Sequence, residues 1–413
     1  MSEWKATSFK NVVNLVTGFP FNSVSYTNNL DDVKLLRGDN IIQGALRWEG
    51  VKYWPKVDLS IEQKYKLLSG DVVLAMDRPW IEAGLKYSVI KECDLPCYLV
   101  QRVACLRAKD EVDAKFLLYV VGSSDFTRHI LSVETGTAVP HISGSQILEF
   151  SFLLPPLPEQ HAIASVLSSL DNKIDLLHRQ NKTLEAMAET LFRQWFVEEA
   201  DEGWEEGTFE KWIIDTVGGE WGKESIEGDY TKMVNCIRGT DISDLTIGIP
   251  SKTPVRFVKE KKYESICPKN GDIILEISGG TENQSTGRTC YINPQIEKLF
   301  IYPIVFSNFC RLIRVRKYEY SLFLFCYFQY LYKHDEFFSL ENGTSGIKNL
   351  NYKVFLFELP YPMPDEKKVI GFHKQVISLF QKIDQNKNQI RTLEKLRDTL
   401  LPKLMSGKVR VEV

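Results

Sequence analysis

The residues most suggestive of chemistry lie in the second half of the chain. Asp272 and Glu276 stand four residues apart in the segment DIILEI and resemble half of a nuclease site, but Ser278 occupies the place where a Lys would be needed. The segment 293–296 reads NPQI, so it lacks the second Pro and the aromatic residue of the N-P-P-aromatic motif of amino-methyltransferases. No GxxxxGK[ST] loop for ATP phosphates is present. These gaps predict a chain without catalytic residues of its own.

The cysteine and histidine patterns predict no metal site. The eight cysteines form no CxxC pair, and Cys93 and Cys97, which stand four residues apart, have no histidine cluster nearby in the sequence. Scattered cysteines in a chain without an apolar leader are typical of reduced thiols, so we expect a cytoplasmic protein.

Length and charge limit the classes of protein to consider. A chain of 413 residues allows two or three domains, and 44% hydrophobic and 25% charged residues are typical of globular proteins. The net charge of −3 by itself argues against a nucleic-acid binder. Between residues 231 and 357, however, 17 Lys and Arg outnumber 12 Asp and Glu, which allows a basic face there. An ordinary solvated surface would give the same pattern.

The chain contains an internal duplication, which is its most informative feature. Residues 151–199 and 357–407 each begin with a Pro-rich segment, FLLPPLPEQ and FELPYPMPDE, and each continues into a long helical pattern. Further short segments recur about 200 residues apart. Trp4 to Phe9 matches Trp204 to Phe209, and Gly70–Asp71 matches Gly271–Asp272. The sequence therefore predicts a pseudo-twofold molecule, which suits a pseudo-twofold target such as duplex DNA.

Both long patterns carry a heptad stripe of apolar residues. Steps of four and three from residue 163 meet nine apolar residues in ten positions, and adding 209 to each position meets eight in ten. Such a narrow stripe predicts a coiled coil, although each stripe could instead pack on its own globular block. The helices are expected at about 159–199 and 365–401, with Pro402 ending the second near Leu400 or Leu401.

If a pseudo-twofold axis relates the two halves of the chain and the two helices pack side by side, the helices are expected to be antiparallel. Pairing about residue 179 places Asn181 opposite Asn386, where the two amides can satisfy each other. The same register places Leu177 opposite Ile390 and Ala188 opposite Leu379. The predicted seam residues are Leu177, Asn181, Leu184, Ile383, Asn386 and Ile390.

Each globular block is predicted to be mixed α/β. The runs 71–76 and 272–277 follow a Gly and are typical of buried strands, whereas 116–121 and 322–328 are expected to be helices. The aromatic-rich run 320–332 is too short to cross a bilayer. The expected fold is therefore α/β: two mixed α/β blocks joined by two long antiparallel coiled-coil helices in a pseudo-twofold repeat.

Two polar, glycine-rich loops of the second block, 278–288 and 342–348, could contact nucleic acid. Small residues allow close backbone approach, and amides, hydroxyls and cations can bond phosphates and base edges. Ordinary surface loops would have a similar composition. Together with their counterparts in the first block, the predicted DNA-contacting residues are Arg78, Lys86, Thr137, His141, Gly280, Thr281, Asn283, Ser285, Thr286, Arg288, Thr344, Ser345 and Lys348.

The motifs resemble those of one known family. The segment LPPLPEQ at 154–160 with its long helix, TGTAVPHIS at 135–143, GWEEGTF at 203–209 and LRDTLLPKLMSGKV at 396–409 are similar to specificity subunits of type I restriction–modification systems. The resemblance implies target-recognition domains at 1–150 and 200–357. It also implies a spacer helix at 151–199, and a second spacer helix with the tail at 358–413.

The resemblance also implies a division of labour. Each target-recognition domain would read half of a split site in double-stranded DNA, and the helical spacer would set the gap between the halves. Two methyltransferase subunits would bind the chain, and restriction subunits would bind through them. The chain itself would hold no cofactor, since S-adenosylmethionine, ATP and Mg²⁺ would belong to the partners. A stand-alone DNA-binding regulator and a helical adaptor that binds only protein remain alternatives.

Overall fold

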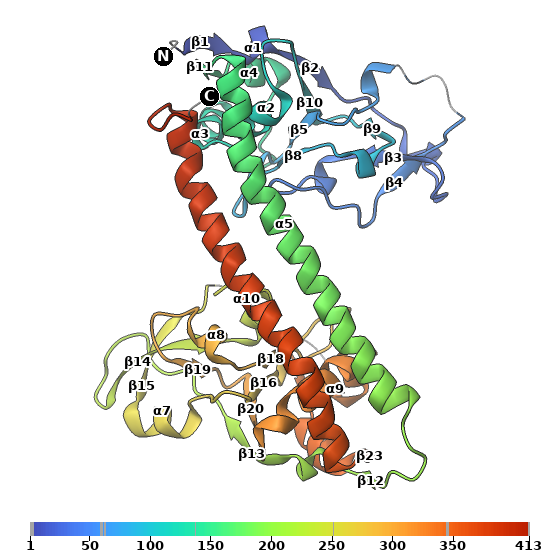
Figure 1. Ribbon diagram of the computed structural model, residues 1–413, viewed down its shortest axis with the longest axis vertical. Helices are drawn as coiled ribbons and strands as arrows, with labels where there is room; N and C mark the ends of the chain where they lie inside the picture. Colours follow the sequence, from blue (N-terminus) through green and yellow to red (C-terminus); the bar gives the residue numbers. More distant parts are fainter. Residues whose placement is uncertain are drawn as a thin grey trace. The chain divides into compact units, whose positions relative to one another are not determined.

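The chain forms two compact units in the computed structural model, which describes residues 4–57, 61, 63–136, 138–250, 252–343 and 347–411. Unit 1 comprises Met1–Lys173 with Leu393–Val413, and unit 2 comprises Ile174–Thr392. Two long helices, α5 (Leu157–Arg193) and α10 (Glu366–Met405), each contribute one part to each unit (Figure 1).

The central sheet of unit 1 is antiparallel and has the strand order β2-β10-β5-β8, formed by Val13–Thr17, Val103–Ala108, Val72–Ala75 and Tyr87–Val89. The β-branched, apolar residues of β5 are buried throughout, as the sequence predicts. A second sheet has the order β4-β3-β9 (Lys52–Trp54, Val33–Leu36 and Cys97–Leu99), in which β3 and β9 are parallel.

Unit 2 repeats both sheets. Its central sheet has the order β13-β20-β16-β18 (Ile213–Gly218, Cys310–Val315, Ile273–Glu276 and Thr289–Tyr291). Its second sheet has the order β15-β14-β19 (Val255–Lys259, Tyr230–Ile237 and Ile304–Phe306), with β14 and β19 parallel. The predicted internal repeat and the mixed α/β fold are therefore confirmed.

Short strand pairs complete each unit. β1 (Lys5–Ser8) pairs with β11 (Ser151–Leu154), and β12 (Glu206–Gly207) pairs with β23 (Tyr361–Pro362), so the matching segments near residues 4 and 204 play the same role. The other short strands are β6 (Trp80–Ile81), β7 (Gly84–Leu85), β17 (Ser278–Gly279), β21 (Glu341–Asn342) and β22 (Lys348–Leu350).

Shorter helices cover the sheets. The two helices expected from the sequence are α2 (Ala114–Val121) and α9 (Ser321–Lys333). The remaining ones are α1 (Phe9–Val12), α3 (Ser124–Val133), α4 (Gly144–Leu148), α6 (Ile242–Thr246), α7 (Glu260–Ile266) and α8 (Pro294–Glu297). Within the described part of the chain, no helix has the length and apolar character needed to cross a membrane.

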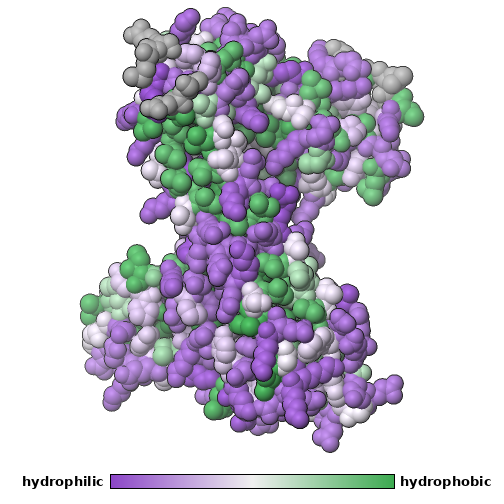
Figure 2. Space-filling model, in the orientation of Figure 1, coloured by the Kyte–Doolittle hydropathy of each residue, from purple (hydrophilic) through white to green (hydrophobic). Residues whose placement is uncertain are grey.

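The helix stripes pack in two ways. Near the ends of the long helices, Ile163 and Leu167 of α5 and Leu404 of α10 join the core of unit 1, while Phe192 and Phe372 join an aromatic core in unit 2. Farther from these ends, Asn181 of α5 contacts Asn386 of α10. Figure 2 shows mostly hydrophilic residues where these helices are exposed, which agrees with their apolar residues being turned inward.

The expected end of the second helix is wrong. Pro402 lies inside α10, which continues to Met405. A proline in a helix removes one backbone hydrogen bond and strains the preceding turn. Here the distortion falls in the last turn, and the following Leu404 is only 2% exposed in the core of unit 1. Burial of that side chain offsets the loss and keeps the last turn helical.

Candidate nucleic-acid interface

The loop between β16 and β18 borders a groove in unit 2. The groove encloses about 790 Å³, and both polar and aromatic residues line it. Gly279 and Gly280 have backbone φ values of +153° and +76°, which residues other than glycine rarely adopt. The two glycines therefore allow the loop to turn sharply here. The lining residues are Trp221, Arg238, Gly239, Thr240, Glu276, Ser278, Gly279, Gly280, Thr281, Gln284, Arg288, Asn308, Phe309 and Ile347.

A buried ion pair forms one part of the groove wall. Arg288 donates from Nε to Oε2 of Glu276 at 2.8 Å and from Nη2 to Oε1 at 2.5 Å. The side chain of Glu276 is 1% exposed and that of Arg288 is 17% exposed. The hydrogen bonds to Glu276 raise the pKa of Arg288 above its usual value, against the opposing effect of burial. Glu276 is therefore engaged in orienting the guanidinium of Arg288.

The structure contradicts the predicted DNA contacts of Ser285 and Thr286. Their side chains are 3% and 0% exposed, so they cannot reach DNA in this structure. Thr286 donates from its backbone N and from Oγ1 to Oε1 of Glu341, at 2.6 and 2.8 Å. Thr286 therefore holds the base of the loop to Glu341. Thr281 and Asn283, by contrast, are exposed as a DNA contact requires.

Lys348 is also engaged within the protein. Its Nζ lies 2.9 Å from Oε2 of Glu341 and 5.0 Å from the ring centre of Phe338. Burial tends to raise the pKa of Glu341, but the hydrogen bonds from Thr286 and Lys348 hold it below its usual value. Much of the positive charge of Lys348 is thus offset before any phosphate approaches. The predicted contacts Thr137, Thr344 and Ser345 lie outside the described residues.

Two of the predicted residues of unit 1, Arg78 and His141, lie next to Asp77. Nδ1 of His141 lies 2.6 Å from Oδ1 of Asp77, and Nη1 of Arg102 lies 2.5 Å from Oδ2. Burial would raise the pKa of Asp77, but these two partners lower it below its usual value. Arg78 is exposed and has a φ of +45°, and its backbone N donates to Pro140 O at 2.7 Å.

Lys86 and Arg288 occupy equivalent positions in the two units. The carbonyl O of Lys86 accepts from Ala75 N at 3.0 Å, and that of Arg288 accepts from Glu276 N at 2.9 Å, at the same point of matching strand pairs. Ala75 provides no carboxylate, so Lys86 has no counterpart to the pair made by Arg288. Burial lowers the pKa of Lys86. The offset between Gly70–Asp71 and Gly271–Asp272 aligns Ala75 with Glu276, and this signal could have revealed the pair.

The centre of the helix seam is polar. Nδ2 of Asn386 donates to Oδ1 of Asn181 at 2.9 Å, and the two residues are 0% and 7% exposed. This contact and the contact of Phe192 with Phe372 run in opposite chain directions, so the helices are antiparallel, as the sequence predicts. Of the other seam residues, Leu177, Ile383 and Ile390 are buried and Leu184 is partly buried.

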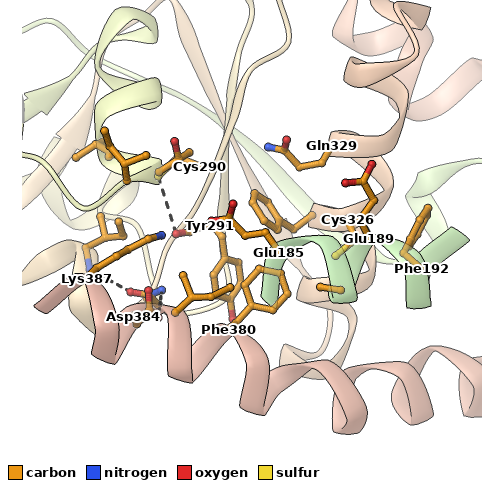
Figure 3. Close-up of a pocket in the computed structure, with 18 of the residues that line it drawn as sticks. Glu185, Glu189, Phe192, Cys290, Tyr291, Cys326, Gln329, Phe380, Asp384 and Lys387 are labelled. Carbon is orange, nitrogen blue, oxygen red and sulfur yellow. Dashed lines mark hydrogen bonds between the residues drawn. The ribbon is translucent and has the colours of Figure 1, made fainter. Parts of the chain in front are cut away.

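A second cavity, of about 280 Å³, lies within unit 2 between α5, α9 and α10 (Figure 3). Asp384 and Lys387 project from α10 at one side of it, and Glu185 projects from α5. Nδ2 of Asn293 donates to Oδ2 of Asp384 at 2.8 Å, while Asn293 Oδ1 caps α8. Asn293 therefore joins α8 to α10. Among the described residues, no group of three His, Cys, Asp or Glu side chains could hold a metal ion.

The comparisons with known proteins agree with the resemblance seen in the sequence. Residues 2–186 match the family model of the type I restriction modification DNA specificity domain. The resemblance seen in the sequence is thereby confirmed for these residues, which are similar to that family. A solved structure of a type I restriction–modification S subunit from M. genitalium shares the fold, with a TM-score of 0.58 and 18% identity over 97% of this chain and 96% of that one.

Two archaeal relatives are similar in sequence. The type I restriction enzyme MjaVIII specificity subunit of Methanocaldococcus jannaschii is 34% identical over 184 residues, which is 44% of this chain and 43% of the relative. This match therefore spans less than half the length of that relative. The MjaIX specificity subunit of the same organism is 26% identical over 74% of this chain and 71% of its own length.

Proposed function

We propose that this chain is the DNA-recognition subunit of a type I restriction–modification complex. The observation that carries the proposal is the repeated unit, in which the same two sheets occur twice with different side chains around equivalent loops. A shared scaffold with different surfaces suits a split DNA site with two different halves. Phosphate contacts would position each unit, and base-edge contacts would supply the sequence preference. The similarity of residues 2–186 to the DNA specificity domain supports the same function.

The helices would bind the enzymes that act on the DNA. Two methyltransferase subunits would dock on α5 and α10, and restriction subunits would join through them. The methyltransferase subunits would use S-adenosylmethionine and would turn the target adenine out of the duplex, while the restriction subunits would use ATP and Mg²⁺. This chain would contribute binding and orientation but no reacting group.

The test is to purify the chain with and without a co-expressed methyltransferase partner. A gel-shift with genomic fragments should show specific binding by the complex, and mapping of methylated adenines should give one bipartite motif. Specific binding by the chain alone, with no effect of the partner, would indicate a stand-alone regulator. Absence of DNA binding by both would indicate a protein adaptor. Methyl transfer by the chain alone would overturn its proposed non-catalytic role.

A further inference from the structure

We propose that Arg288 reads a guanine in the half-site bound by unit 2, and that Glu276 is the positioning residue that holds Arg288 in the reading orientation. The inference rests on the proposed DNA-recognition function and adds a base and two residues to it. It goes beyond the similarity to known subunits, which assigns no base to any side chain.

The hydrogen bonds of Arg288 leave the correct end of the guanidinium available. Glu276 binds the side formed by Nε and Nη2, at 2.8 and 2.5 Å. Each terminal nitrogen of arginine carries two hydrogens, and the weak bond from Nη1 to Ser243 Oγ, at 3.3 Å, uses only one of those remaining. One N–H on Nη1 and one on Nη2 can therefore point in parallel from the end of the group. This fork matches the O6 and N7 acceptors of guanine.

The backbone makes room for this arrangement. A Cβ atom placed on Gly239 or on Gly279 would lie 2.5 Å from Oε1 of Glu276, so any side chain at either position would displace the carboxylate. Both glycines and Arg288 line the groove of about 790 Å³. The groove also holds Thr281 and Gln284, which can bond neighbouring base edges. The pair is thus built into a concave surface that is open to a ligand.

The charge of the site favours a base over a phosphate. Glu276 is almost fully buried and cancels the charge of Arg288, so the pair gains little from a phosphate and retains directional N–H donors. Arg238, on the same groove, is likewise paired, with Nη2 2.7 Å from Oδ1 of Asp241. In unit 1 the equivalent position holds Lys86 opposite Ala75, which cannot form an oriented fork. This contact with guanine is therefore expected from unit 2 and has no equivalent at the Lys86 position of unit 1.

The test uses the chain in complex with its methyltransferase subunits and the methylated motif of the wild-type complex. At the guanine concerned, 7-deazaguanine, which lacks the N7 acceptor, should weaken binding of the wild-type complex. The Arg288→Lys variant should lose roughly 5-fold to 150-fold of its preference for guanine at that position. Its response to 7-deazaguanine should be weaker than that of the wild-type complex, because an ammonium group that Glu276 does not hold as a fork contacts N7 less well. The other half-site should be read as before. Glu276→Gln should lose part of the same preference, because its amide cannot accept both hydrogen bonds.

Arg314→Lys is the matched control. Arg314 makes a similar pair with Asp272, at 3.0 Å, but neither residue lines the groove. This variant should lower stability without changing the base preference. A wild-type complex that methylates a bipartite site lacking such a guanine, or whose guanine preference survives Arg288→Lys, would overturn the inference and leave the proposed function intact. A complex that binds no specific DNA would overturn both.

Discussion

At the scale of single residues, comparison of the two repeated units distinguishes residues that maintain the scaffold from residues that line the groove. Asp71 bonds Arg107 in unit 1, and Asp272 bonds Arg314 in unit 2, each at the start of an equivalent buried strand. Four residues further along each strand, the chemistry differs, because Ala75 corresponds to Glu276. The same Asp–Arg ion pair therefore occurs inside both units, whereas the residue at the position of Ala75 and Glu276 differs. Two units that bind different half-sites would need this combination of a common scaffold and different groove residues.

The Lys86 ammonium group leads to a prediction about the salt dependence of DNA binding. Lys86 has no ion pair among the described residues, so it can approach a phosphate and release counterions. Lys86→Ala should weaken binding to all sequences and flatten the slope of log K against log salt by about one. Arg288→Ala should leave that slope nearly unchanged, because Glu276 already neutralises Arg288. Filter-binding titrations at several salt concentrations measure both, and an unaltered slope for Lys86→Ala would reject the phosphate contact.

The raised pKa of Asp384 leads to a prediction that the stability of the protein depends on pH. Burial raises the pKa of this carboxyl from 3.8 to about 6. Its favourable contribution to folding is therefore complete below about pH 4 and is lost as the pH rises through 6. At pH 8, Asp384→Asn should increase the free energy of unfolding by up to roughly 3 kcal/mol, at about 1.36 kcal/mol per pKa unit. The gain should vanish near pH 4. Urea titrations at both pH values measure the free energy of unfolding. A lower value for Asp384→Asn than for the wild type at pH 8 would mean that the attraction of Asp384 to Lys387 outweighs the cost of burying its carboxylate.

Local patterns predicted much of the molecule, but most long-range contacts could not be derived from them. Strand β5 and helix α9 are determined by spacing within short segments, and the contact of Asn181 with Asn386 follows from matching the two repeated heptad stripes. Burial of Thr286 depends on Glu341, which is 55 residues away in sequence. The persistence of α10 past Pro402 depends on a pocket for Leu404 in a different part of the chain. Composition could identify the groove loop, but it could not show which loop side chains face inward.

At the scale of the elements, the seam is asymmetric in its chemistry. The pseudo-twofold exchange relates the pair Asn181 and Asn386 to the positions of Leu177 and Ile390, which are both buried and apolar. One layer of the seam is therefore polar and its counterpart is not. Oδ1 of Asn386 has no hydrogen-bond partner among the described residues. The amide pair is thus better suited to fixing the register than to adding stability.

A double-mutant cycle tests this interpretation of the seam. Asn181→Leu alone should strand the amide of Asn386 and lower the free energy of unfolding by roughly 1–3 kcal/mol. Changing both residues to Leu should recover much of the loss, because the layer then becomes as apolar as its counterpart. Thermal or urea unfolding measures the three variants, and Leu177→Ala serves as a control that removes only packing. Equal losses in the single and double variants would show that the amides do not act as a pair.

At the scale of the whole molecule, repetition of the unit predicts modular recognition. Replacing residues 1–150 with the matching block of a relative should change one half of the methylated motif and leave the other half unchanged. The physical reason is that each block has its own sheets and its own core. Mapping methylated adenines in cells that express the hybrid gives the result. A change in both halves, or in neither, would contradict independent reading by the two units.

The length of the helices should set the spacing between the half-sites. α5 and α10 contain 37 and 40 residues. Inserting four residues in one helix adds about 6 Å and rotates the downstream part of that helix by slightly more than one turn. At about 3.4 Å per base pair, the preferred gap should grow by one or two base pairs, while both half-sites stay the same. Substituting four surface residues of the same helix, without insertion, controls for altered docking of the methyltransferase subunits. An insertion variant that still methylates the original spacing would show that the helices do not measure the DNA.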